Sequence, residues 1–110
     1  MGVFDRFYDK ERLLRKTIEI ENDLYDKLNE ISKSKYMTST NMLINACIDE
    51  LTKTENIKIY ENNDKYSSMK HSLLIMESLS NELDRLKQKY NMSITKLVNM
   101  AIKNAISETE

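Results

Sequence analysis

Residues 15–20 have the sequence Arg15-Lys-Thr-Ile-Glu-Ile20. If this stretch is extended, Ile18 and Ile20 lie on one face, because successive side chains of a strand point to opposite faces. The other face then carries Arg15, Thr17 and Glu19. Such an alternation over six residues predicts a short strand with one buried and one exposed face.

The second half of the chain repeats the first in a single register without a gap, which we call the gapless register. Its identical pairs are Ile20 and Ile75, Leu24 and Leu79, Leu28 and Leu83, Met37 and Met92, Thr40 and Thr95, and Ala46 and Ala101. Conservative pairs such as Thr17 and Ser72 lie between them. The matches fall at positions that a fold would constrain, so the pattern indicates an internal duplication.

Each copy continues from its strand into two amphipathic helices. The first helix is expected to begin at Asp23 or Ser78, residue types that cap helix N-termini, and its apolar stripe follows a spacing of four and three residues. After a polar break, Thr38 and Ser93 are expected to cap a second helix. The apolar positions of that second helix are Met42, Leu43, Ala46, Cys47 and Leu51 in the first copy, and Leu97, Val98, Ala101, Ile102 and Ala105 in the second.

A unit with one short strand cannot bury its own apolar faces, so the two copies must pack against each other. The predicted fold is mainly α with a short antiparallel β-ribbon, in which strands 15–20 and 70–75 pair. Two ribbon–helix–helix repeats then form a pseudo-dimer within one chain. The expected organisation is an N-terminal segment 1–14, a first repeat 15–55, a linker 56–68 and a second repeat 69–110.

The composition excludes several kinds of site. One Gly cannot build a phosphate-binding glycine loop, and one His with one Cys cannot supply the usual four ligands of a zinc site. His71 and Cys47 are therefore expected to be structural. No apolar run approaches the ~20 residues of a membrane helix, and the first residues lack a signal-peptide core. We expect a soluble, cytoplasmic protein that is not an enzyme, needs no cofactor and does not enter a membrane.

Residues 15–53 and 69–107 resemble the ribbon–helix–helix family of DNA-binding proteins, the class that includes the Arc and MetJ repressors. The most typical segments are Ile18-Glu-Ile-Glu-Asn-Asp-Leu24 and Met92-Ser-Ile-Thr-Lys-Leu-Val-Asn-Met-Ala-Ile102. Two copies in one chain look like the tandem, TraY-type members of that family, which are accessory proteins of conjugative plasmids.

The resemblance implies sequence-specific binding of double-stranded DNA, with the ribbon in the major groove and its outward side chains on base edges. Carried onto this chain, the base-contacting residues would be Arg15, Thr17, Glu19, Lys70, Ser72 and Leu74. The family also holds phosphates at the start of each second helix. Those positions are here Thr38, Ser39 and Thr40, and Ser93, Ile94, Thr95 and Lys96. The function would be that of a transcriptional repressor or of a plasmid or phage accessory factor.

Two other interpretations remain open. The same fold could serve as a protein-interaction module, such as an antitoxin or scaffold, and the net charge of −1, acidic Glu19 and apolar Leu74 favour it. A helix-turn-helix protein with residues 38–52 as recognition helix is less consistent with the sequence, because that helix carries Asp49 and Glu50. Residues 1–14 are expected to form a short helix over the fold or an arm that docks a protein partner or another protomer, and self-association on DNA would involve such contacts.

Overall fold

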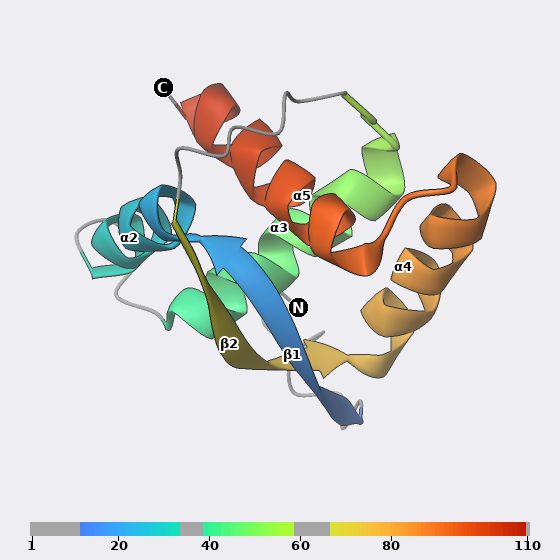
Figure 1. The fold of residues 1–110 in the computed structure, drawn as a ribbon, viewed down its shortest axis with the longest axis horizontal. Coiled ribbons are helices and arrows are strands. Elements are labelled where there is room, and N and C mark those ends of the chain that lie inside the picture. Colours follow the sequence, from blue (N-terminus) through green and yellow to red (C-terminus); the bar gives the residue numbers. More distant parts are fainter. Residues whose placement is uncertain (1–11, 34–38, 59–66, 110) are drawn as a thin grey trace, which may run out of the picture.

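A computed structural model describes residues 12–33, 39–58 and 67–109 of the chain (Figure 1). This part of the chain is mainly helical, with one two-stranded antiparallel sheet, which confirms the predicted fold class at that level. The elements are β1 (Leu13–Glu21), α2 (Asn22–Ile31), α3 (Thr40–Thr54), β2 (Ser68–Met76), α4 (Glu77–Tyr90) and α5 (Ile94–Thr109). Most of the expected N-terminal segment, residues 1–11, lies outside the described residues, and β1 already begins at Leu13.

The two strands pair antiparallel along their full lengths, as the antiparallel pairing of 15–20 with 70–75 predicts. Thr17 lies opposite Ser72, with Arg15 opposite Leu74 on one side and Glu19 opposite Lys70 on the other. Both strands extend beyond the alternating stretches 15–20 and 70–75, because backbone pairing continues where the side chains are exposed. Leu13 is 50% exposed and Met69 58% exposed, so the hydrophobic pattern does not reveal these strand ends.

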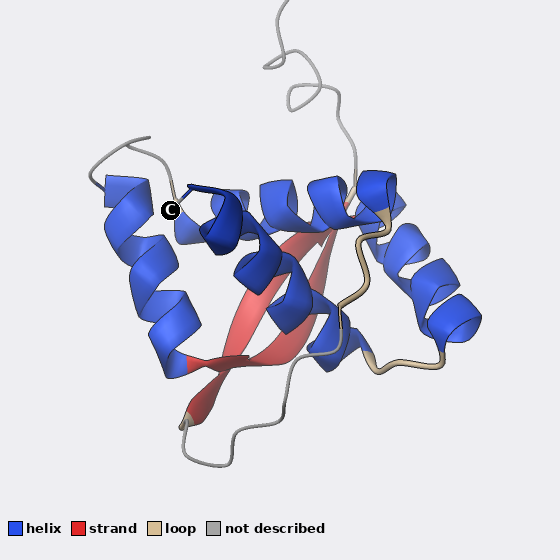
Figure 2. Ribbon diagram, turned by 90° about the horizontal axis from the view of Figure 1, so that it is seen from above, coloured by secondary structure: helices blue, strands red, loops and turns tan. Residues whose placement is uncertain are grey.

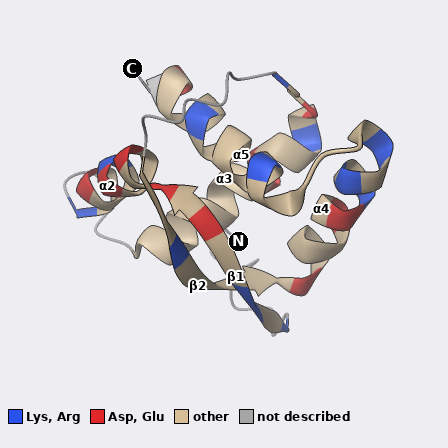
Figure 3. Cartoon of the chain, viewed as in Figure 1, with Lys and Arg blue, Asp and Glu red and all other residues tan. Residues whose placement is uncertain are grey.

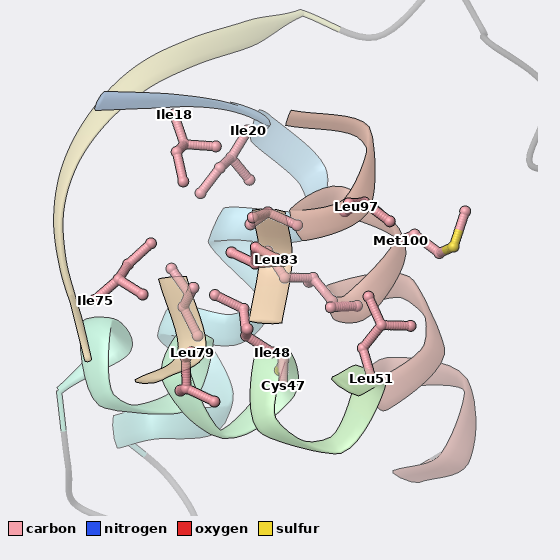
Figure 4. Close-up of a cluster of buried hydrophobic side chains, with 14 of the residues drawn as sticks. Ile18, Ile20, Cys47, Ile48, Leu51, Ile75, Leu79, Leu83, Leu97 and Met100 are labelled. Carbon is pink, nitrogen blue, oxygen red and sulfur yellow. The ribbon is translucent and has the colours of Figure 1, made fainter. Parts of the chain in front are cut away.

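The inner face of the ribbon packs on the helices and forms one core with them. Ile18, Ile20, Leu73 and Ile75 are all at most 3% exposed. Figure 4 shows Ile18 and Ile20 extending from the ribbon toward Leu83 and Leu97 of the helices. Helices α2 and α4 lie at opposite ends of the molecule, with α3 and α5 between them (Figures 1 and 2).

The second helix of the first copy is rotated relative to the prediction. Ala46, expected on its apolar face, is exposed, whereas Ile44 and Ile48 are completely buried. Helix α3 therefore matches α5 in a register shifted by one position from the gapless register, so that Thr40 corresponds to Ile94. The physical reason is a difference in connection length. The stretch from the start of α2 to the start of α3 is one residue longer than the stretch from the start of α4 to the start of α5.

The first helix of each copy begins without the expected side-chain cap. Asp23 and Ser78 lie inside the first turn, and the cap positions Glu21 and Met76 make no side-chain capping hydrogen bond. Backbone carbonyls of the residues immediately before the opposite strand accept from the helix starts instead. The N–H of Asn22 donates to the carbonyl of Ser67 at 2.9 Å, and the N–H of Glu77 donates to the carbonyl of Arg12 at 2.9 Å.

Candidate nucleic-acid interface

The outward face of the ribbon carries the six residues expected to contact bases. Five of them are exposed, namely Arg15, Thr17, Glu19, Lys70 and Ser72, and Leu74 is half-buried. Arg15 Nη1 donates a hydrogen bond to Ser72 Oγ at 2.9 Å, which orients the guanidinium across the ribbon. The structure thus brings these side chains together on one face, on which charges of both signs lie (Figure 3).

Two asparagines of the second helices fix the outer edges of the ribbon. Asn45 Nδ2 donates to the Leu74 carbonyl at 2.8 Å, and Asn45 Oδ1 accepts from the Met76 N–H at 3.1 Å. Asn99 holds β1 in the same way: its Nδ2 donates to the Glu19 carbonyl at 2.9 Å and its Oδ1 accepts from the Glu21 N–H at 3.1 Å.

Asn41 adds a second pair of hydrogen bonds on the β2 side only. Its Nδ2 donates to the Leu74 carbonyl and its Oδ1 accepts from the Leu74 N–H, both at 2.9 Å. A two-stranded ribbon has two open edges, whose unpaired N–H and C=O groups would otherwise face water or another strand. The asparagines satisfy part of these edges and thereby hold the outward side chains in place relative to the helices.

Sequence analysis missed these asparagines, although a signal for them is present. When the second helices are compared in the register that places Thr40 on Ile94, Ser39 matches Ser93, Asn45 matches Asn99 and Ile48 matches Ile102. A comparison that allows one gap between the two helices of a copy finds these identities. The gapless register hides them.

The starts of α3 and α5 carry the residues expected to contact phosphates. Ser39 Oγ accepts from the Met42 N–H at 3.1 Å and Ser93 Oγ accepts from the Lys96 N–H at 3.2 Å, so both serines are helix N-caps. Thr38, the cap expected for α3, lies outside the described residues. Ser39, Ser93, Thr95 and Lys96 are exposed.

Two of the expected phosphate contacts have side chains that point away from solvent. Thr40 is 8% exposed, and its hydroxyl donates to Asn29 Oδ1 at 2.9 Å. Ile94 is half-buried and packs against the core. Only the backbone N–H groups of these two residues are therefore suited to an anion at the helix N-terminus.

His71 and Cys47 have structural surroundings, as expected. The His71 imidazole stacks on the Tyr25 ring, with centroids 3.8 Å apart and planes 12° apart, on the inner side of the ribbon. Its Nε2 is buried without a hydrogen-bond partner among the described residues. Burial raises the pKa of the Cys47 thiol to about 12, which keeps the sulfur protonated and unreactive at neutral pH.

A polar cluster joins the end of α3 to the end of α4. Glu55, the left-handed residue that terminates α3, accepts hydrogen bonds from Lys89 Nζ at 2.7 Å and from the Tyr90 hydroxyl at 2.8 Å. Arg85 Nη1 lies 3.4 Å from the same carboxylate. The hydrogen bonds from Lys89 and Tyr90 lower the pKa of Glu55 to about 2. The hydrogen bond to Glu55 in turn raises the pKa of Lys89. These contacts tie the C-terminal ends of α3 and α4 together, and we call the four side chains the Glu55 clamp.

Other kinds of site find no support in the described residues. No group of three or more His, Cys, Asp or Glu side chains among them is arranged to hold a metal ion. Within the same residues, no helix combines the length and apolar character needed to cross a membrane. Comparison with known proteins finds no matching family model, no similar curated protein and no similar solved structure.

Proposed function

We propose that this chain is a sequence-specific double-stranded DNA-binding protein that inserts its two-stranded ribbon into the major groove. The observation that carries the proposal is the outward face of the ribbon, on which Arg15, Thr17, Lys70 and Ser72 are exposed together. The major groove admits a two-stranded ribbon, Arg and Lys bind guanine O6 and N7, and hydroxyl side chains can donate to or accept from base edges. Ser39, Thr95 and Lys96, at the helix N-termini, are the proposed phosphate contacts.

The proposal includes a pseudo-dimer, in which two ribbon–helix–helix repeats pair within one chain. It is supported by equivalent contacts in the two halves. Thr17, at the centre of the ribbon, lies opposite Ser72, its own counterpart in the gapless register. Asn45 of the first repeat holds β2, and Asn99 of the second repeat holds β1, so each second helix fixes the strand of the other repeat.

Such a protein would act as a transcriptional repressor or as an accessory factor of a plasmid or phage-like element. Both roles need only specific binding that positions the protein on DNA, without catalysis or a cofactor. This matches the chemistry of the described residues, in which the one thiol is buried and protonated and the one imidazole is stacked on the inner side of the ribbon.

A protein-interaction module is the second candidate function. Three observations favour it: Glu19 places a negative charge on the outward face, Leu74 is apolar, and Leu13 is half-exposed at one ribbon end. DNA binding accounts for Arg15, Lys70 and Lys96, whereas the interaction module leaves these cations without a role.

The proposal is tested by a mobility-shift titration of the full chain with duplex DNA from the region upstream of its own coding sequence, repeated across salt concentrations. A matched duplex of scrambled sequence is the control. We expect tighter binding to the upstream DNA. We also expect the logarithm of the affinity to fall linearly with the logarithm of the salt concentration, because Lys and Arg contacts with phosphates release counterions. Equal and weak binding to both duplexes, followed by capture of a protein partner through the ribbon, would support the interaction module instead.

A further inference from the structure

We infer that the chain binds DNA in one orientation, on a site whose two half-sites differ in sequence. This inference rests on the proposed function and concerns the chemistry of the two ends of the ribbon. Its basis is a contrast between the strand register, which is two-fold symmetric about the centre of the ribbon, and the outward side chains, which differ between the two ends.

The strand register relates the two ends by a two-fold rotation. With Thr17 opposite Ser72 at the centre, a two-fold rotation of the ribbon exchanges Arg15 with Lys70 and Glu19 with Leu74. Asn99 holds the Glu19 carbonyl at 2.9 Å and Asn45 holds the Leu74 carbonyl at 2.8 Å, so each of these positions is fixed by an equivalent amide. Asn41 adds hydrogen bonds at the Leu74 end, but they bind backbone groups of the strand and leave its outward side chain unchanged. A difference in base preference between the two half-sites therefore comes from the outward side chains.

The side chains at exchanged positions have different chemistry. One end of the ribbon pairs Arg15 with Leu74, and the other pairs Lys70 with Glu19. In the major groove, Leu suits the methyl group of thymine, whereas a carboxylate accepts a hydrogen bond from cytosine N4 and is repelled by the acceptor groups of guanine and thymine. The Glu19 carboxylate makes no hydrogen bond or ion pair with the described residues, so it is available to a base. A palindromic site would present the same base pair to Leu74 and to Glu19, and at least one of them would be mismatched.

The flanking helices differ in the same sense. Through Asn99, α5 is attached to the Glu19 end, and its first turn carries the exposed Lys96. Through Asn45, α3 is attached to the Leu74 end, and there the half-buried Met42 takes the position of Lys96. The Glu19 end thus combines a carboxylate that selects its base with the phosphate contact of Lys96. The Arg15 end has no lysine at the equivalent position of its helix.

The experiment uses the full chain and starts with selection of its site from a pool of random-sequence duplexes. A cleavage reagent, iron-EDTA, is then attached to one of two single-cysteine variants, Leu13→Cys or Ser68→Cys. Leu13 lies opposite Met76 at one end of the ribbon and Ser68 lies opposite Glu21 at the other. The unsubstituted protein is the control for labelling, because Cys47 is buried.

Binding in one orientation predicts that each variant cuts the DNA on one side of the site only, and that the two variants cut on opposite sides. Cuts on both sides from each variant would overturn the inference while leaving specific DNA binding intact. Failure of the selection to enrich any sequence would instead overturn the proposed function.

A symmetrised variant is the positive control. Glu19→Leu/Lys70→Arg gives both ends the Arg and Leu pair, and both substitutions are at exposed positions. On the selected site, whose two half-sites differ, this variant carrying either label should cut on both sides, because its two ribbon ends carry the same side chains and no longer favour one orientation. One-sided cutting there would show that the four side chains do not set the orientation, and would overturn the inference. A last measurement uses the unsymmetrised chain and the cytosine that we expect opposite Glu19 in the selected site. Replacing this cytosine by thymine should weaken binding roughly 5- to 150-fold.

Discussion

Asn45 and Asn99 make the same three hydrogen bonds in the two halves of the molecule. Each amide donates to the carbonyl four residues earlier in its own helix, Asn41 or Thr95, and to a strand carbonyl, Leu74 or Glu19. Each side-chain oxygen also accepts from a strand N–H two residues further on. These contacts couple the position of each strand to a helix from the other half of the chain.

Removing these amides should destabilise the fold by leaving strand groups unpaired. Asn45 is 2% exposed, so we expect Asn45→Ala to cost about 1–3 kcal/mol, the penalty of a buried group without a partner. Asn99→Ala should cost less, because its surroundings are more exposed. Chemical denaturation measures both, with Asn81→Ala on the exposed face of α4 as the matched control. Wild-type stability in both variants would show that the asparagines do not hold the ribbon.

The pairing of the two halves predicts how a fragment behaves. Residues 1–55 alone would lack β2, α4 and α5, and would expose Ile18, Ile20, Ile44 and Ile48, which are now buried. We therefore expect this fragment to be unfolded or to form a weak homodimer, measured by circular dichroism and light scattering. A stable folded monomer would contradict the pseudo-dimer, and a compact dimer of the full chain would indicate that two chains exchange their halves.

Much of this fold could be predicted from the sequence, and the features that could not be predicted were missed for physical reasons. The alternation at Ile18 and Ile20 locates the ribbon and its inner face, because a half-buried strand must show that period. The buried face of α3 was mispredicted, because a connection longer by one residue shifts this helix relative to the repeat. Ala46, expected in the core, is exposed, and Ile44 is buried there instead. The edge contacts of Asn45 escape any periodicity analysis, because an asparagine in a helix has the same pattern whether it is solvated or holds a strand.

The equivalent leucines Leu28 and Leu83 should make large contributions to stability. They are 3% and 1% exposed and belong to one core. Truncation of either to Ala should cost about 2–5 kcal/mol, from lost burial and the cavity left behind. Thermal or chemical denaturation measures the loss, and Leu13→Ala at a half-exposed position is the control. Two core variants that unfold like the wild type would show that these side chains are not central to the core.

The clamp at Glu55 predicts an acid-dependent loss of stability. Its pKa, about 2 in the folded chain against an ordinary value of 4.5, means that the folded state favours the ionised carboxylate, through the hydrogen bonds from Lys89 and Tyr90. This contribution is complete above pH 4.5 and is lost as the pH falls toward 2. The stability difference between wild type and Glu55→Gln, measured by urea denaturation, should therefore shrink between pH 6 and pH 3. A difference that stays constant over that range would show that the Glu55 charge does not stabilise the fold.

The final prediction separates base contacts from phosphate contacts in the proposed DNA complex. Arg15 is exposed at one end of the ribbon, and its side chain is oriented by Ser72. Arg15→Ala should cost about 1–3 kcal/mol of binding and relax the preference at one base pair, as the loss of a bidentate guanine contact does.

Lys96, in the first turn of α5, should behave differently. Its charge opposes the helix dipole, a small local cost that a nearby phosphate would offset. Lys96→Ala should weaken binding to all sequences alike and reduce the slope of log affinity against log salt by about one. Mobility shifts with the selected site, with single base-pair variants of it and with scrambled DNA, each across salt, distinguish the two patterns. If Arg15→Ala and Lys96→Ala both keep full affinity and specificity, the ribbon does not contact the bases, and the protein-interaction module becomes the better account of its exposed face.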